Sequence, residues 1–127
     1  MGSAASMLSV YGLCRLFGLD ESLTVSLLPK SVTTPVAVSI AESAGGVVPI
    51  TVVAVIGTGI LGSMIAPLLI RIFKVTEPMA AGLAIGASSH AVGTSKAVEL
   101  GEVEGAMSGL AIGVCGIITV LISMVVL

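Results

Sequence analysis

The fold is decided by Leu28-Pro29-Lys30-Ser31-Val32-Thr33-Thr34-Pro35, a stretch that interrupts the middle of the apolar segment 21–44. Its two prolines lie six residues apart. Each proline removes a backbone N–H donor and disfavours helix in the residue before it, so a continuous helix cannot run through this stretch. The sequence therefore predicts two helical pieces separated by unwound backbone.

A second apolar segment, residues 78–101, is interrupted by Gly86-Ala87-Ser88-Ser89-His90-Ala91-Val92-Gly93-Thr94-Ser95-Lys96. Glycines, hydroxyl groups, one imidazole and one ammonium group gather here, so we expect another break. Alignment of residues 30–45 with 90–105 gives six identities in sixteen positions and places Lys30 opposite His90. This can be coincidence in an apolar chain, but paired interrupted segments in corresponding places are typical of transporter binding sites.

Composition indicates a single integral membrane domain over residues 1–127. Hydrophobic residues make up 56% of the chain and charged residues 9%, with a mean hydropathy of +1.22. Soluble domains carry about 25% charged residues, so a water-soluble fold is excluded. The net charge of −2 and the lack of a basic cluster exclude nucleic acid as a partner. Cys14 and Cys115 match no metal spacing and are interpreted as packing residues, so neither metal nor cofactor is expected.

Three further apolar runs, residues 1–17, 47–73 and 105–127, complete a prediction of about five membrane segments in an all-α, multi-pass protein with two discontinuous helices. If all five segments cross, Arg15, Arg71 and Lys74 fall on one side, which the positive-inside rule places in the cytoplasm. If the broken segments are re-entrant, Arg15 falls opposite the other two. We therefore favour crossing, with re-entrant segments as the alternative.

Both breaks would then lie near mid-membrane, where non-helical backbone must be buried or line a polar cavity. Thr33 or Thr34 can cap a half-helix that starts at Pro35, and Thr94 or Ser95 can cap one that starts beside Lys96. Helix N-termini carry partial positive charge and bind anions. The breaks therefore predict a site for a small anionic carboxylate, without metal.

The side chains of both breaks form the candidate substrate-binding set: Lys30, Ser31, Thr33, Thr34, Ser88, Ser89, His90, Thr94 and Lys96. Structural alternatives stay open. The two lysines can pair with Glu42 and Glu99, and Lys96 is the better candidate for such a bridge because Glu99 shares its helix face. His90 can be a packing residue bonded to a carbonyl, or it can take part in proton coupling.

Small residues predict close helix packing. Gly82-Leu83-Ala84-Ile85-Gly86 and Gly109-Leu110-Ala111-Ile112-Gly113 are the same pentapeptide, and its GxxxG spacing lets two helix backbones approach. We also expect contact with membrane lipid and a homo-oligomer. The sequence contains no GxSxG, HExxH or P-loop motif. No catalytic residue is therefore proposed, and the protein is expected not to be an enzyme.

The motifs Ser26–Pro35, Thr58–Gly62 and Gly86–Lys96, followed by acidic residues at 99, 102 and 104, resemble the LrgB/CidB family, which includes YohK-type proteins. The resemblance covers the C-terminal portion of a longer family member. It implies a bacterial inner (plasma) membrane protein, described as antiholin-like and affecting murein hydrolase export and cell lysis. It also implies a small LrgA/CidA-like membrane partner. Plastid relatives are glycolate/glycerate translocators, and bacterial pairs are similar to pyruvate transport systems.

Two function classes follow. The first is a transporter of small monocarboxylates of the pyruvate, glycolate and glycerate class, which agrees with the anion site deduced from the breaks. The alternative is a holin/antiholin-type pore or oligomeric lysis regulator without a specific substrate. Substitutions of the lysines should affect the transporter most, and substitutions of the GxxxG glycines should affect the pore most.

Overall fold

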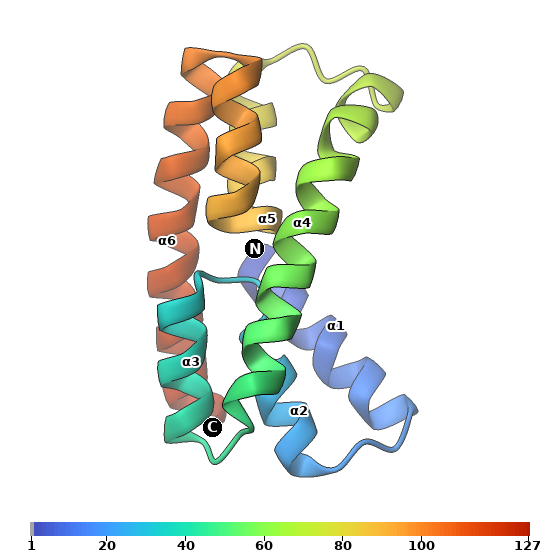
Figure 1. Cartoon of the computed structure of the whole chain (residues 1–127), viewed down its shortest axis with the longest axis vertical. Helices are drawn as coiled ribbons and strands as arrows, with labels where there is room; N and C mark the ends of the chain where they lie inside the picture. The colour runs from blue at the N-terminus through green and yellow to red at the C-terminus, as the bar shows by residue number, and fades with distance from the viewer. Residues whose placement is uncertain (1) are drawn as a thin grey trace.

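The computed structural model describes residues 2–127, which form six helices and no strand within that range (Figure 1). The helices are α1 (Gly2–Leu16), α2 (Glu21–Leu27), α3 (Thr34–Ser43), α4 (Val48–Ile72), α5 (Pro78–Leu100) and α6 (Glu102–Val126). The all-α prediction is confirmed, and the expected segments agree closely with these bounds. Met1, which opens the first expected segment, lies outside the described residues.

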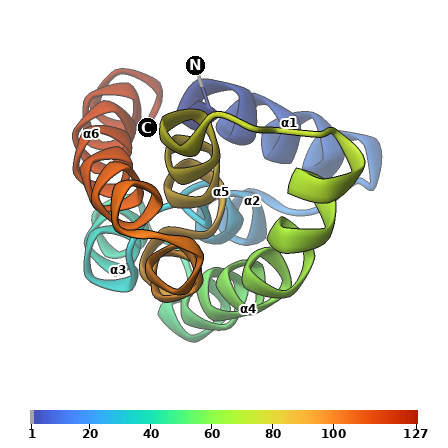
Figure 2. The same ribbon diagram turned by 90° about the horizontal axis from the view of Figure 1, so that it is seen from above.

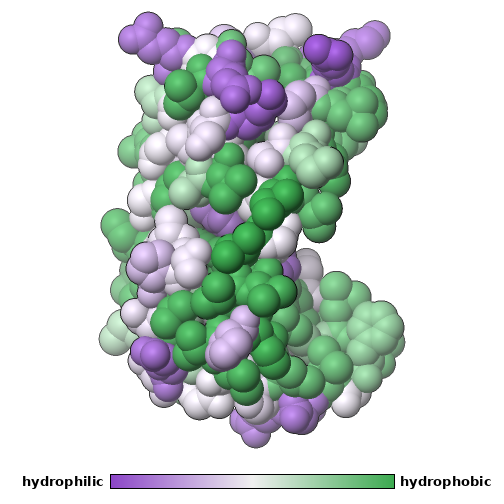
Figure 3. Space-filling model, viewed as in Figure 1, coloured by the Kyte–Doolittle hydropathy of each residue, from purple (hydrophilic) through white to green (hydrophobic). Residues whose placement is uncertain are grey.

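Two long helices, α4 and α6, run in opposite directions along the whole length of the molecule (Figure 1). Each has 25 residues, and each is long and apolar enough to cross a membrane. Only 11% and 17% of their most apolar windows are buried inside the protein. Polar residues gather at the two ends of the molecule, and apolar residues form much of the surface between them (Figure 3). The number of five crossing segments is not confirmed.

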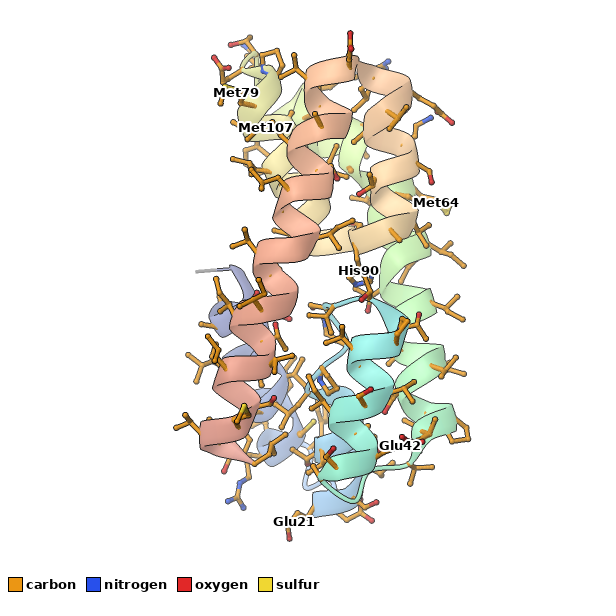
Figure 4. All side chains as sticks on the ribbon, turned by 90° about the vertical axis from the view of Figure 1, so that its left-hand side faces the viewer. Glu21, Glu42, Met64, Met79, His90 and Met107 are labelled. Atoms are coloured by element: carbon orange, nitrogen blue, oxygen red, sulfur yellow. The ribbon has the colours of Figure 1, made fainter. Side chains whose placement is uncertain are left out.

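The first broken segment is a re-entrant hairpin formed by α2 and α3. Glu21 at the start of α2 and Glu42 near the end of α3 lie at the same end of the molecule (Figure 4). Ser26 of α2 lies beside the start of α4, because its Oγ accepts from the backbone N–H of Val47 at 2.6 Å and its carbonyl accepts from Thr51 Oγ1 at 2.8 Å. The expectation that this segment crosses is therefore wrong.

The second broken segment, α5, is also a re-entrant hairpin. It bends at His90, where φ is 39° and ψ is −135°, and both of its arms pack on the first half of α6. The backbone of Gly86 in the first arm lies against Ser108, and Thr94 in the second arm hydrogen-bonds the same Ser108 through its hydroxyl at 2.7 Å. Crossing is wrong here too, because residues before and after the bend lie at the same level of α6.

Local sequence explains where the helices begin and end. Pro35, Pro49 and Pro78 each lie in the first turn of a helix, where a missing N–H costs no hydrogen bond. The side chain of Asp20 accepts from the N–H of Leu23 and caps α2. Gly45, with φ at 77°, ends α3 in the left-handed conformation that glycine adopts without strain. Asp20, Gly45 and Pro49 lie where the chain turns at the end of the molecule from which the first hairpin enters, and Pro35 begins the helix at the tip of that hairpin.

Helix α4 connects the two hairpins through apolar contacts along its length. Val55 packs in a cluster with Val32 and Ala37 of the first hairpin, and Ala66 packs in a cluster with Ile85 and Ala97 of the second. Seen from above, α2 and α5 lie between α1, α4 and α6 (Figure 2). The hairpins enter from opposite ends of the molecule, and each packs against a different half of α4.

The two copies of the repeated pentapeptide have different environments, which gives a matched test of the second hairpin. A Cβ atom added at Gly86 would clash with the backbone of Ser108, 2.8 Å from its Cα, whereas one added at Gly113 would meet nothing within 4 Å. We expect Gly86→Ala to lower the free energy of unfolding by about 1–3 kcal/mol. Gly113→Ala should leave it unchanged or slightly raised. Thermal unfolding of the purified variants in detergent measures the difference, and equal midpoints would contradict the close approach of α5 and α6.

Candidate functional site

The tips of the two hairpins meet at mid-height in the molecule (Figure 4). Nε2 of His90 lies 3.2 Å from the backbone carbonyl oxygen of Lys30. A carbonyl oxygen can only accept, so Nε2 carries the proton in this contact. Val92 and Ser89 beside the second tip pack closely against Gly59 and Gly62 of α4, where no side chain keeps the backbones apart. One hydrogen bond thus joins the two tips, and Ser89 and His90 of the second tip are buried.

The contact between Lys30 and His90 joins residues 60 positions apart, the same offset at which the two broken segments align. Each hairpin is followed by one long helix, and the two long helices are antiparallel (Figure 1). This order describes two structural repeats of opposite orientation, the arrangement of inverted-repeat membrane proteins. Equivalent residues that touch each other lie close to the axis relating the repeats, so the tips mark the centre of the molecule.

One helix begins at each tip. Helix α3 begins at Thr34, after Thr33 in the N-cap position, and the second arm of α5 begins after His90. The first N–H groups of each helix have no carbonyl partner within that helix, and they carry partial positive charge. The side chain of Thr33 makes no capping hydrogen bond. Both tips therefore present backbone donors suited to an anion.

The break in α5 falls at His90, within the stretch 86–96 where it was expected, but four to five residues before the expected capping residues. Thr94 and Ser95 lie inside the second arm and do not cap a helix, so this prediction is wrong. Thr94 Oγ1 donates instead to the carbonyl of His90 at 2.9 Å, one turn earlier. The physical reason is that His90 itself takes the non-helical conformation, which the glycines on either side of it do not share.

The two lysines of the candidate set have different environments. Lys30 lies at the first tip, half-buried, and its ammonium donates to Ser31 Oγ at 3.3 Å. Lys96 lies in the second arm and pairs with Glu99 at 2.5 Å, as its sequence spacing predicted. This is the one ion pair among residues 2–127, so Lys30 forms none there. Glu42 lies at the end of the molecule and not at the tip (Figure 4). Lys30 is thus the cation of the site.

The predicted hydroxyl groups divide between the tips and the helix interiors. Ser31, Thr33 and Thr34 lie at the first tip and are partly exposed. Ser89 is fully buried beside the second tip and hydrogen-bonds Ser88 at 3.2 Å. The exposed Ser88 donates to the carbonyl of Ala84 one turn earlier, so its donor is already used. A role of any of these residues in substrate binding stays a prediction.

Two serines join this cluster without having been predicted. Ser6 of α1 hydrogen-bonds Ser31 through its hydroxyl at 2.5 Å, and the fully buried Ser108 of α6 hydrogen-bonds Thr94. Thr94 gives its single proton to His90, so Ser108 is the donor to Thr94. Each serine lies on a different helix from its partner, 25 and 14 residues away in sequence. No local sequence pattern predicts such a pair.

A separate groove of about 550 Å³ runs between α3 and α6 and begins at Pro35 beside the first tip. It is lined by Pro35, Val36, Ser39, Ile40, Ser43, Ala44, Val120, Ser123, Met124 and Leu127. The three serines among these residues donate to carbonyls of their own helices. The groove therefore offers apolar surface and not the donors that an anion requires.

The fold and the meeting tips define a class: a helical membrane protein in which two hairpins enter from opposite ends and are each followed by a helix long and apolar enough to cross a membrane. The chain belongs to the LrgB-like family, whose family model matches residues 1–127.

Curated relatives agree with this assignment. The chain is 39% identical to "Antiholin-like protein LrgB" of Bacillus mycoides (strain KBAB4) over 122 residues, which is 96% of this chain and 53% of that protein. Proteins of the same name from Bacillus cereus (strain B4264) and Bacillus anthracis (strain CDC 684 / NRRL 3495) are 38% identical with the same coverage. The chain thus spans about half the length of these relatives. No solved structure matches it.

The conformation of His90 provides a test of the contact between the tips. Its positive φ costs a side-chain-bearing residue about 1–3 kcal/mol, which the surroundings must offset. His90→Ala loses the ring contact with Lys30 and keeps the backbone strain, whereas His90→Gly loses the contact and relieves the strain. We expect both variants to unfold at lower temperature than the parent, with the Gly variant the more stable by about 1 kcal/mol. An Ala variant as stable as the Gly variant would contradict the bend at His90.

Proposed function

We propose that this chain forms the substrate-binding core of a membrane carrier for small monocarboxylates, at the place where its two hairpin tips meet. The observation that carries the proposal is the meeting of the two hairpin tips at mid-height, where α3 and the second arm of α5 begin and where Lys30 lies. An ammonium group inside a membrane protein requires a partner. No protein carboxylate among residues 2–127 pairs with Lys30, so a carboxylate substrate would supply the missing charge.

The charge at the tips favours a substrate with one negative charge. Lys96 is neutralised by Glu99, which leaves Lys30 as the cation beside the partial charges of the helix N-termini. The partly exposed hydroxyls of Ser31, Thr33 and Thr34 belong to the same tip and would contact a second oxygen of the ligand. Pyruvate, glycolate and glycerate are small and combine one carboxylate with one or more further oxygens, which is the chemistry that such a site would recognise.

The inverted order of the repeats supports transport over binding alone. Each hairpin enters from a different end of the molecule, and rocking of one repeat against the other would expose the tips first to one side and then to the other. We place the protein in the bacterial inner membrane as a multi-pass protein. Because the chain spans about half of its relatives' length, the complete carrier would draw further helices from another polypeptide, such as an LrgA/CidA-like protein or a second copy.

A holin/antiholin-type pore or oligomeric lysis regulator is the second candidate, and two observations favour it. The relatives are named antiholin-like proteins. The second copy of the pentapeptide, on α6, has open space at Gly109 and Gly113, which leaves a surface of small residues where another helix could pack closely. Such a pore would conduct without saturation and would depend on this surface more than on Lys30.

The decisive experiment compares the two lysines in a counter-flow assay, in which proteoliposomes loaded with unlabelled pyruvate or glycolate take up the labelled compound from outside. Lys30→Gln should raise the apparent KM about tenfold to hundredfold, because a charged hydrogen bond contributes about 1.5–3 kcal/mol. Lys96→Gln is the matched control, since it removes the same charge from a position outside the tips, and it should leave uptake within about twofold.

The full-length relative from Bacillus mycoides, assayed beside this chain, shows whether uptake requires the other half of the family's length. Saturable uptake by this chain that survives Lys30→Gln would contradict the proposed site. A non-saturable leak that disappears on Gly113→Leu but not on Lys30→Gln would instead establish the pore.

A further inference from the structure

One serine of α1 differs from the others on the same helix. Ser9 donates to the carbonyl of Ala5 one turn earlier, as serines within helices commonly do. Ser6 instead hydrogen-bonds Ser31 of the first hairpin tip, at 2.5 Å between the two oxygens. Its hydroxyl therefore serves a contact between elements that are 25 residues apart in sequence.

Apolar packing fixes α1 against the first hairpin, so the position of Ser6 is determined by the fold. Met7, Val10 and Cys14 of α1 form a buried cluster with Leu28, two residues before Lys30. Each of these four side chains is at most 6% exposed. Because Met7 follows Ser6 directly, the cluster holds the Ser6 hydroxyl at the tip.

We propose that Ser6 is a positioning residue for the anion site: through Ser31 it holds the ammonium group of Lys30 in place. The inference rests on the proposed function for its importance to substrate binding, but the positioning of Lys30 can be measured independently. Ser6 itself is not expected to contact the substrate.

The hydrogen bonds explain how the effect is transmitted. An ammonium group can only donate, so Ser31 Oγ accepts from Lys30 Nζ at 3.3 Å. The bond between Ser31 and Ser6 fixes the rotation of the Ser31 side chain and therefore the position of its accepting oxygen. Without Ser6, the Ser31 hydroxyl is free to turn to another partner. The long side chain of Lys30, which has large rotamer freedom, would then lose its anchor.

Lys30 is thus held from two directions. Its backbone carbonyl accepts from His90 of the second hairpin, and its side chain donates to the pair formed by Ser31 and Ser6. Helix α1 belongs to neither of the two repeats. It therefore makes the first tip different from the second and places the cation of the site on one side of the axis between them.

The test compares Ser6→Ala with Ser9→Ala, which removes a hydroxyl from the same helix without touching the tip. The first readout needs no substrate: the rate at which a small membrane-permeant acylating reagent modifies Lys30, resolved by mass spectrometry. We expect Ser6→Ala to raise this rate about threefold to tenfold, the range of one lost hydrogen bond. Ser9→Ala should leave it unchanged, and Ser6→Thr, which keeps a hydroxyl, should restore the parent rate.

The second readout is counter-flow of labelled glycolate, in which Ser6→Ala should raise the apparent KM by a similar factor and leave the maximal rate within about twofold. Ser31→Ala should raise the acylation rate in the same way, and the double variant should show no further change in this rate, because the two serines hold Lys30 as one unit. Equal acylation rates in Ser6→Ala and Ser9→Ala would overturn the inference. Faster acylation in a protein without saturable uptake would support the positioning of Lys30 and overturn only the carrier function.

Discussion

Unwound backbone cannot face lipid, and this constraint determines how the two broken segments are arranged. Each break leaves N–H and C=O groups without partners in its own helix, and an unsatisfied group at membrane depth costs several kcal/mol. The tips meet each other, with His90 donating to the carbonyl of Lys30, and Ser89 and His90 of the second tip are buried. This contact satisfies one backbone carbonyl, joins the two repeats and brings two helix N-termini to the same level of the molecule.

The long helices α4 and α6 pack closely against the second hairpin and so support the contact between the tips. Small residues on α4 let the second tip approach at Gly59 and Gly62, and Gly86 of α5 lets α6 approach at Ser108. Lys30 remains half-buried with hydroxyl groups as its neighbours and without a carboxylate among the described residues. The same packing that hides the breaks from lipid therefore produces a cationic centre, which connects the stability of the fold to the proposed binding of a carboxylate.

The elements of this fold could be predicted from sequence, but the path of the broken segments could not. Prolines fixed the first break within a few residues, and the offset of 60 placed Lys30 opposite the residue that it contacts. Whether each segment crosses the membrane or returns depends on tertiary packing, such as the hydrogen bond from Val47 to Ser26. The chain carries too few charges for their distribution to distinguish these two paths. The second break fell within its expected stretch, but the start of its second arm was misassigned because several glycines and serines were equally suited to it. The contribution of Ser6 depends on the docking of α1, which no local pattern encodes.

Sided cysteine labelling tests most directly whether the hairpins return to the end from which they enter. Glu21→Cys, Glu42→Cys and Glu102→Cys would be introduced singly into a background in which Cys14 and Cys115 are replaced by alanine. A membrane-impermeant maleimide would then be applied to vesicles of each orientation. The account predicts that positions 21 and 42 react from the same side of the membrane and position 102 from the opposite side. Labelling of positions 21 and 42 from opposite sides would contradict it.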